Sequence, residues 1–355
     1  MPTYMIYRLI LKLRNAYFRD GRRSTKADVP VVCVGNITVG GTGKTPHTEM
    51  VLRELKASER WGESRIAVLS RGYRRRSKGF QILPTEASAA IYGDEPSQIK
   101  RKFPDVTVAV DKNRVEGCAL LAKSDNGPAA GIIVLDDAYQ YRRLQADLNI
   151  VLSPYSRPAA TDSLLPGGRL RDLPERLYDA DIVIVTKCPT VLDEEEKADA
   201  ARTLGYESFD PASGIAVHEG RSQMLLFSGV SYEAPQPVFH NADTRYTYSH
   251  KAVLFSGIAN DAPMRNYLSD SYEIVGAIRF SDHHKYTRAN IKRLMAMMKK
   301  NPTATFYTTE KDAQRLRDLN FIPEKLRERL FCLPIRVEFL SEKEKELFTE
   351  KLITL

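Results

Sequence analysis

The sequence predicts an α/β fold built from two domains. Its 355 residues are 43% hydrophobic and 28% charged, a length typical of about two domains and a composition typical of soluble chains with packed cores. Short, nearly continuous apolar runs alternate with helical patterns, which indicates parallel strands covered by helices on both faces. After about residue 223 the chain becomes rich in turn, aromatic and β-branched residues, so we place a domain boundary there.

The first domain is expected to span residues 1–223. Its predicted strands correspond to the apolar runs 30–35, 65–70, 105–110, 131–137, 148–153 and 181–186. A helix is expected to begin near Pro46, where proline is tolerated because a first-turn N–H has no intrahelical acceptor. An acidic helix over residues 192–205 is expected near the end of the domain.

Residues 224–249 are expected to form an extended linker or β-hairpin, and residues 250–355 a smaller α/β domain. The predicted strands of that domain are 251–259, 272–280, 304–309 and 330–339, with a helix around 290–298. A last helix follows Ser341, and Glu344 is expected to complete a capping box at its start.

Residues 1–28 are expected to contain a basic amphipathic helix within the first domain. They carry seven basic and two acidic side chains, and apolar residues recur at helical spacing from Ile6 to Tyr17. Such a helix either lies on an anionic membrane surface or packs on its own domain, and the residues leave both interpretations open. The segment is too short and too charged to span a bilayer, and it lacks the apolar core and cleavage site of a secretory signal.

Overall charge and cysteine content narrow the class of protein. The formal net charge of +8 fits nucleic acid, an anionic membrane or a phosphorylated substrate as partner. The four cysteines are scattered without C-x-x-C spacing, which indicates neither a zinc site nor a disulfide framework and fits a reducing compartment.

The stretch VGNITVGGTGKTPH, residues 34–47, predicts a loop that binds nucleotide phosphates. The common pattern is G-x-x-x-x-G-K-[ST], and here Thr38 stands at the first glycine position. Glycines allow backbone N–H groups to converge on phosphate oxygens where a helix begins. We expect the nucleotide to contact Thr38, Val39, Gly40, Gly41, Thr42, Gly43, Lys44 and Thr45. The first domain is therefore predicted to be a P-loop NTPase-type domain.

Such a loop also predicts a magnesium site. Lys44 is expected to reach the β and γ phosphates, and Thr45 to bind Mg²⁺ through its hydroxyl. A carboxylate at the end of a neighbouring strand normally completes the site, and Asp136 and Asp137 end the apolar run 131–137. In combination with the loop, these aspartates are interpreted as metal ligands rather than as a solvated strand end.

Three further segments each allow two interpretations. Asp94 and Glu95 lie in YGDEPSQ, which is either the loop of a catalytic base or a plain helix start. The adjacent His283 and His284 follow an aspartate and offer a proton-transfer site or a surface loop. The basic residues 71–79 either grip an anionic substrate or form a solvated loop.

The order of these segments resembles the tetraacyldisaccharide 4′-kinase family, from the N-terminal helix to about residue 315. The matching stretches are VGNITVGGTGKTP, SRGYRRR, GDEP, LDDAYQYRRLQADLNIV, LLPGGRLRD, FSGIAN, FSDHHKY and TEKDA. The resemblance implies a lipid kinase that uses MgATP to phosphorylate the 4′-hydroxyl of a tetraacylated glucosamine disaccharide 1-phosphate in lipid A biosynthesis. It implies a place at the cytoplasmic face of the inner membrane of a Gram-negative-type cell, reached through the N-terminal helix.

The resemblance also implies roles for individual residues. Asp94 matches the catalytic base and His283 its partner, whereas His284 has no implied role. The implied ligands of Mg²⁺ are Thr45, Asp136, Asp137 and the nearby Glu95. The implied substrate contacts are Arg71, Arg74, Gln140 and Arg171. The family usually has D-D-G-F-Q-H where this chain has D-D-A-Y-Q-Y over residues 136–141, which changes the packing around Gln140.

Asp94 and His283 lie in different predicted domains, so the site is expected to be complete only when the domains close. We expect a monomer that binds no nucleic acid.

Two other classes of protein compete with a lipid kinase. One is a soluble P-loop GTPase or ATPase of the metal-centre assembly type, although Pro189 stands where a guanine-reading T-K-x-D motif needs aspartate. The other is a nucleic-acid-binding module, which leaves Lys44, Thr45 and Asp136 unexplained.

Overall fold

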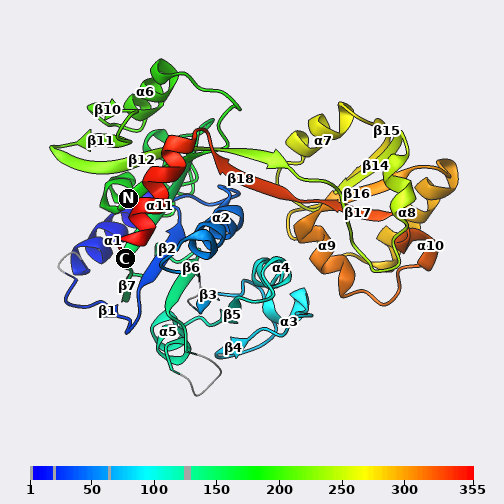
Figure 1. Cartoon of the computed structure of the whole chain (residues 1–355), viewed down its shortest axis with the longest axis horizontal. Helices are drawn as coiled ribbons and strands as arrows, with labels where there is room; N and C mark the ends of the chain where they lie inside the picture. Colours follow the sequence, from blue (N-terminus) through cyan, green and yellow to red (C-terminus); the bar gives the residue numbers. More distant parts are fainter. Residues whose placement is uncertain (1–2, 19–20, 63–64, 124–128) are drawn as a thin grey trace.

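The computed structural model describes residues 3–18, 21–62, 65–123 and 129–355. Figure 1 shows a larger and a smaller body joined by two long strands, β12 (Arg221–Tyr232) and β18 (Ile335–Phe339). These strands pair antiparallel, with Ser228 opposite Phe339 and Tyr232 opposite Ile335. The connection between the bodies is therefore a two-stranded ribbon.

The larger body is built on a sheet of eleven strands among the described residues, with β18 paired to the side of β12. In order across the sheet the others are β10 (Ser208–Asp210), β11 (Ile215–His218), β12, β9 (Ile182–Thr186), β8 (Leu148–Pro154), β2 (Val31–Gly35), β6 (Ile132–Asp136), β3 (Ile66–Ser70), β5 (Thr107–Val110) and β4 (Gln81–Ile82). Neighbours from β12 to β5 are parallel. The short strands β1 (Thr25–Lys26) and β7 (Leu144–Gln145) pair separately.

Both faces of this sheet are buried, because alternate residues of each strand enter different cores. In β2, Val31 and Cys33 belong to one core and Val32 and Val34 to the other. The first core also contains residues of α1 (Thr3–Tyr17), α5 (Arg114–Leu121) and α6 (Glu194–Thr203). The second contains residues of α2 (Lys44–Ala57), α4 (Asp94–Lys102) and α11 (Glu342–Ile353). The short α3 (Ala89–Tyr92) precedes α4, and 3-10 turns lie at Ala159–Thr161 and Pro174–Asp179.

The smaller body has a five-stranded sheet in the described part of the chain. Its order is β13 (Gln236–Pro237), β17 (Leu330–Leu333), β16 (Thr305–Thr309), β14 (Lys251–Ser256) and β15 (Glu273–Arg279). Its helices are α7 (Ala262–Ser269), α8 (Arg288–Lys300), α9 (Glu310–Arg317) and α10 (Glu324–Arg327), and a 3-10 turn lies at Thr244–Tyr248. Phe306 and Tyr307, adjacent on β16, enter different cores, so this sheet is also covered on both faces.

The ends of the predicted domains differ from the structure. The expected strand 330–339 is two strands, with Pro334 between them, because proline has no N–H to continue a ladder. The chain from β18 onward returns to the larger body, where Phe348 and Leu352 of α11 are buried in its core. Residues 224–249, expected as a linker or hairpin, begin inside the larger body: Met224–Phe227 of β12 pair in parallel with β9, and Ser228–Tyr232 pair with β18 in the connection between the bodies.

The capping box predicted at the last helix is only half formed. The Ser341 hydroxyl accepts from the backbone N–H of Glu344 at 3.2 Å. The Glu344 carboxylate accepts instead from the backbone N–H of Phe227 at 3.1 Å. Glu344 therefore fastens α11 to the large sheet.

The N-terminal helix α1 ends at Tyr17, well before residue 28, and residues 1–2 and 19–20 of that segment lie outside the described residues. Leu11 is buried at 3% exposure, and Asn15 donates to Asp172 at 2.9 Å. The apolar residues on which the amphipathic prediction rested remain exposed: Ile6, Leu9, Ile10, Leu13 and Tyr17. Helix α1 is thus docked by a different stripe from its main apolar one. No helix in the described ranges has the length and apolar character needed to cross a membrane.

Candidate functional site

The phosphate-binding loop follows the carboxyl end of β2 and leads into α2, the strand–loop–helix context that such a site requires. Gly43 has φ 94°, a left-handed conformation that favours glycine. The Thr42 hydroxyl accepts from Asn36 at 2.8 Å, and the Thr42 carbonyl accepts from the Thr186 hydroxyl at 3.0 Å. These bonds fix the loop to the ends of β2 and β9.

Two of the predicted phosphate contacts are already engaged through their backbone. The N–H of Val39 donates to the carbonyl of Arg169 at 2.7 Å, and the N–H of Thr42 donates to the carbonyl of Gly40 at 3.0 Å. In this conformation these two N–H groups are not free to bind phosphate.

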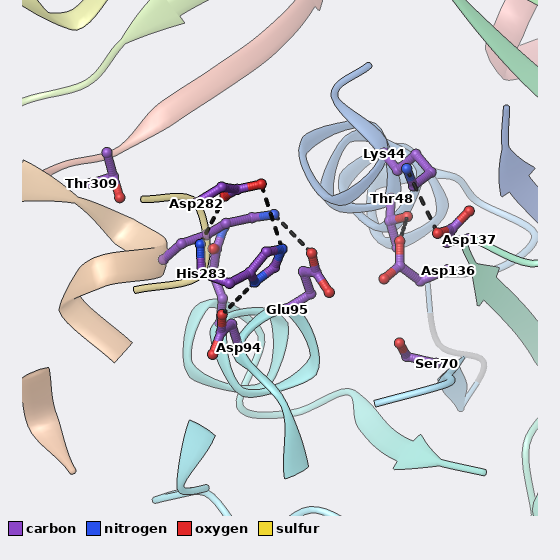
Figure 2. A network of polar contacts seen from close by, with 12 residues as sticks. Lys44, Thr48, Ser70, Asp94, Glu95, Asp136, Asp137, Asp282, His283 and Thr309 are labelled. Atoms are coloured by element: carbon purple, nitrogen blue, oxygen red, sulfur yellow. Dashed lines mark hydrogen bonds and ion pairs between the residues drawn. The ribbon is translucent and has the colours of Figure 1, made fainter. Parts of the chain in front are cut away.

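Lys44 and the two aspartates form the first half of the site (Figure 2). Asp136 ends β6, the neighbour of β2, and its Oδ1 accepts from the Thr48 hydroxyl at 3.0 Å. Lys44 Nζ lies 3.7 Å from Asp137 Oδ2. Thr45 is buried on the same turn of α2. Because β2 and β6 are neighbouring strands, Lys44 and the two aspartates lie together at one edge of the sheet.

The two aspartates differ in charge environment. Burial, with the nearby carboxylates of Glu95 and Asp137, raises the pKa of Asp136 to about 7. Burial acts on Asp137 in the same direction, but Lys44 and Arg171 outweigh it and hold the pKa of Asp137 below its ordinary value. The positive charge near Asp136 is thus too small to keep the pKa of this buried carboxylate at its ordinary value.

This environment fits a divalent cation, because a cation beside Asp136 would favour its ionised form. Within the described ranges, no group of three or more His, Cys, Asp or Glu side chains is arranged to hold a metal ion by itself. A P-loop magnesium site does not need one, since the nucleotide supplies further oxygen ligands.

Asp94 and His283 form the second half, and they come from different bodies. Gly93, with φ 104°, passes so close to Gly72 that a Cβ on it would lie 3.2 Å from the Gly72 Cα. Asp94 follows as the first residue of α4. Its Oδ2 lies 3.3 Å from His283 Nδ1 and accepts from Arg315 Nε at 2.8 Å.

The ionisation of Asp94 follows from these contacts. Burial by itself raises the pKa, but hydrogen bonds from His283 and Arg315 outweigh it and keep the pKa of Asp94 below its ordinary value. Asp94 is therefore an ionised carboxylate at neutral pH, able to accept a proton. Beside it, Glu95 Oε1 accepts from Lys311 Nζ at 2.8 Å, and Figure 2 shows Glu95 on the side of this group that faces Asp136.

His284, which had no implied role, packs within the smaller body. Its ring stacks on Phe280 with centroids 4.4 Å apart, and its Nε2 lies 3.0 Å from the side-chain oxygen of Asn290. It points to the start of α8 rather than to Asp94.

The residues predicted to contact substrate lie at different distances from the site. Arg171 donates to Asn36 and Asp137 inside the site. Arg74 covers the Tyr73 ring, which in turn lies 5.6 Å from the His283 ring. Arg71 is exposed just after β3.

Gln140 lies beside α1. Its carbonyl accepts from Arg14 of that helix, and its buried amide nitrogen has no partner in the described structure. The N-terminal helix is therefore in contact with Gln140, one of the predicted substrate contacts.

Several residues near the site were not predicted from the sequence. Lys311 and Arg315 lie in and just after the TEKDA segment, to which no role was given, although their i,i+4 spacing on a helix places both on one face. His47 was also missed. Its Nδ1 lies 2.7 Å from the Gly43 carbonyl and its Nε2 2.9 Å from the Ser228 hydroxyl, and burial lowers its pKa to about 4. A neutral His47 thus ties the loop to β12.

Backbone strain is concentrated at this site. The described non-glycine residues with positive φ are Arg74, Asp137, Lys187, His283 and Glu219. Four of them border the site: Lys187 donates to the Gly41 carbonyl, and Arg74, Asp137 and His283 have the contacts described above. Glu219 lies elsewhere. Such conformations persist only where the surroundings impose them, and they cluster at functional sites.

Comparison with known proteins gives consistent matches. A family model described as tetraacyldisaccharide-1-P 4′-kinase matches residues 1–353. A tetraacyldisaccharide 4′-kinase of Parabacteroides distasonis is 38% identical over 354 residues, covering 97% of this chain and 91% of that protein. One of Porphyromonas gingivalis is 37% identical over 361 residues, covering 99% and 95%. The crystal structure of "apo" form LpxK from Aquifex aeolicus in complex with ATP has a TM-score of 0.72 at 24% identity, covering 100% of this chain and 98% of that chain. This likeness confirms the predicted fold class.

Proposed function

This chain belongs to the tetraacyldisaccharide 4′-kinase family, and we propose from that membership how its site works. The enzyme transfers the γ-phosphoryl group of ATP to the 4′-hydroxyl of a tetraacylated glucosamine disaccharide 1-phosphate, a step of lipid A biosynthesis. The proposed residue roles rest on one observation, which is that the two halves of the site face each other. Lys44, Thr45 and Asp136 lie at the phosphate loop, and Asp94 with His283 faces them from α4 and the smaller body.

In the proposed mechanism, Asp94 is the general base. The 4′-oxygen of the sugar forms a bond to the γ-phosphorus as the bond from that phosphorus to the bridging oxygen of ADP breaks. The hydroxyl proton passes to Asp94, which His283 orients. Lys44 stabilises the negative charge on the phosphoryl oxygens.

Thr45, Asp136, Asp137 and Glu95 are the residues that would hold Mg²⁺. The ion would supply neutralisation of phosphate charge. Lys311 binds Oε1 of Glu95, which leaves Oε2 as the oxygen that would reach the ion.

The direct test is transfer of labelled phosphate. We expect label from γ-labelled MgATP to appear on the lipid disaccharide 1-phosphate in detergent micelles, with little release of free phosphate when the lipid is left out. Hydrolysis of ATP or GTP at the same rate without lipid, and no labelled lipid, would instead favour the GTPase or ATPase alternative.

The proposal includes peripheral binding to the anionic cytoplasmic face of the inner membrane through α1, with the protein acting as a monomer. Support comes from the orientation of α1. Its apolar stripe faces solvent, and Arg8 and Lys12 are exposed beside it. Further support is the hydrogen bond from Arg14 of α1 to the carbonyl of Gln140, a proposed substrate contact.

Replacing Leu9 and Leu13 together with serine is expected to weaken binding to vesicles that contain phosphatidylglycerol by about tenfold or more. These side chains are 54% and 63% exposed, and burying a leucine is worth roughly 1.5–3 kcal/mol. Co-sedimentation with the vesicles measures the effect. Val191→Ser is the matched control, because Val191 is 79% exposed far from α1 in the sequence. Equal binding of the double variant and the wild type would refute the role of α1.

A further inference from the structure

We propose that Arg315 is the positioning residue of the catalytic base, binding the same Asp94 oxygen as His283 and leaving the other Asp94 oxygen free for the acceptor hydroxyl. The inference rests on the proposed function. It assigns a task to a residue that neither the phosphate loop nor the Asp94–His283 pair requires.

The contacts of Asp94 are asymmetric. In the described structure, every hydrogen bond to its carboxylate ends on Oδ2: from Arg315 Nε at 2.8 Å, from Arg315 Nη2, and at 3.3 Å from His283 Nδ1. The other oxygen, Oδ1, has no protein partner among these residues. A general base needs one oxygen that is fixed in place and still open to the proton it accepts. Arg315 holds Oδ2 and so provides that arrangement.

One nitrogen of Arg315 reaches both members of the pair. Nη2 bonds Asp94 Oδ2 and lies 3.3 Å from His283 Nδ1. Because the His283 Nδ1–H donates to Asp94 Oδ2, this nitrogen does not also accept from Nη2, and the two groups lie side by side on the same oxygen. Arg315 therefore holds the carboxylate oxygen to which His283 also bonds.

The guanidinium is itself held rigidly by the smaller body. Its Nη1 donates to Asp312 Oδ1 at 2.9 Å and to the Gly257 carbonyl at 3.2 Å. Asp312 is fully buried and also accepts from the Gly257 N–H at 2.9 Å. Four of the five N–H donors of the arginine are thus bound, two to Asp94 Oδ2, one to Asp312 and one to the Gly257 carbonyl. Lysine, with three donors on one nitrogen, cannot reproduce this set.

An alternative role for Arg315 would be only to hold the two bodies together. The bodies are also joined by Lys311 to Glu95 and by Lys102 to Glu310, each at 2.8 Å. Those ion pairs remain when Arg315 is replaced, so loss of Arg315 should disturb Asp94 more than it disturbs the association of the bodies.

The experiment compares Arg315→Met and Arg315→Lys with Arg317→Met. Arg317 is the matched control: it is on the same helix and donates to the carbonyls of Val238 at 2.8 Å and Pro237 at 3.3 Å, away from the site. We expect Arg315→Met to lower kcat of phosphate transfer by about 30- to 100-fold, with KM for ATP changed by less than about threefold, because only alignment of the base is lost. Arg315→Lys should remain impaired. Millimolar guanidinium should restore part of the activity of Arg315→Met. The control variant Arg317→Met should stay within about twofold of wild type.

A double-mutant cycle separates positioning from stability. If Arg315 acts through Asp94, Arg315→Met should change kcat by less than about threefold in an Asp94→Asn background. The inference is overturned if the losses multiply, if Arg315→Met and Arg317→Met lose activity equally, or if Arg315→Met retains full turnover. If Arg315→Met does not fold, the same cycle is run with Arg315→Lys. Failure of the wild-type enzyme to label lipid would contradict the proposed function itself, whereas labelling by the wild type with any of those outcomes contradicts only this inference.

Discussion

Replacing Asp94 with asparagine is expected to lower kcat by about 10²- to 10⁴-fold, the usual contribution of a general base. Asparagine keeps the size of the side chain and an oxygen that Arg315 can bind, but it cannot take the proton of the sugar hydroxyl. The KM for ATP should change little, because the phosphate loop leads into α2 whereas Asp94 begins α4. Steady-state kinetics with lipid disaccharide and MgATP measure both parameters.

The control for this variant is Asp318→Asn. Asp318 also joins the two bodies, accepting from the Ser88 hydroxyl at 3.0 Å and from the Ala90 N–H at 2.8 Å, but it makes no contact with Lys44 or His283. A loss confined to Asp94→Asn therefore reports chemistry rather than loosening of the bodies. Turnover by Asp94→Asn within about threefold of wild type would show that Asp94 is not the base.

The strands of the large sheet were predictable because a strand buried on both faces is apolar at nearly every position. The run 131–137 became β6, and its final carboxylates sit beside the loop after β2. Local composition sufficed there, since the apolar run and its polar end are read from neighbouring residues.

Contacts between segments that are far apart in the sequence were harder to predict. The pairing of β12 with β18 joins residues more than 100 positions apart, and no periodicity in either segment records it, so the sequence analysis misplaced the ends of both domains. Asp94 and His283 are 189 positions apart. They were linked only through the family resemblance.

Arg315 illustrates a further limit. An arginine at the end of an amphipathic helix is normally interpreted as a solvated charge. Arg315 becomes buried only because α9 packs against α4. The number of its hydrogen-bond partners depends on Gly257, Asp312 and Asp94, which three separate segments provide. Such a residue is found from contacts, and not from spacing.

Replacing Lys44 with methionine is expected to lower kcat by about 10²- to 10³-fold, the usual cost of removing one group that stabilises transition-state charge. Lys44 begins α2 at the end of the glycine loop, where a cation reaches the transferred phosphoryl group. The KM for ATP should also rise, in contrast to Asp94→Asn, because in the proposed mechanism Lys44 binds the nucleotide before the reaction as well as during it.

Lys44 has a second role that the measurement must separate. Without nucleotide it offsets the charge of Asp137, 3.7 Å away, so Lys44→Met should lower the melting temperature even if it never touched ATP. The nucleotide-induced rise in melting temperature, measured without Mg²⁺, isolates the phosphate contact, because a bound ligand stabilises only as far as it binds the folded state. We expect that rise to shrink in Lys44→Met and to persist in Lys56→Met, a control on the same helix whose lysine pairs with the exposed Asp105. If both variants keep the full rise, Lys44 serves only as the ion-pair partner of Asp137, and the charge of the phosphates must be met by Arg171 and the loop backbone instead.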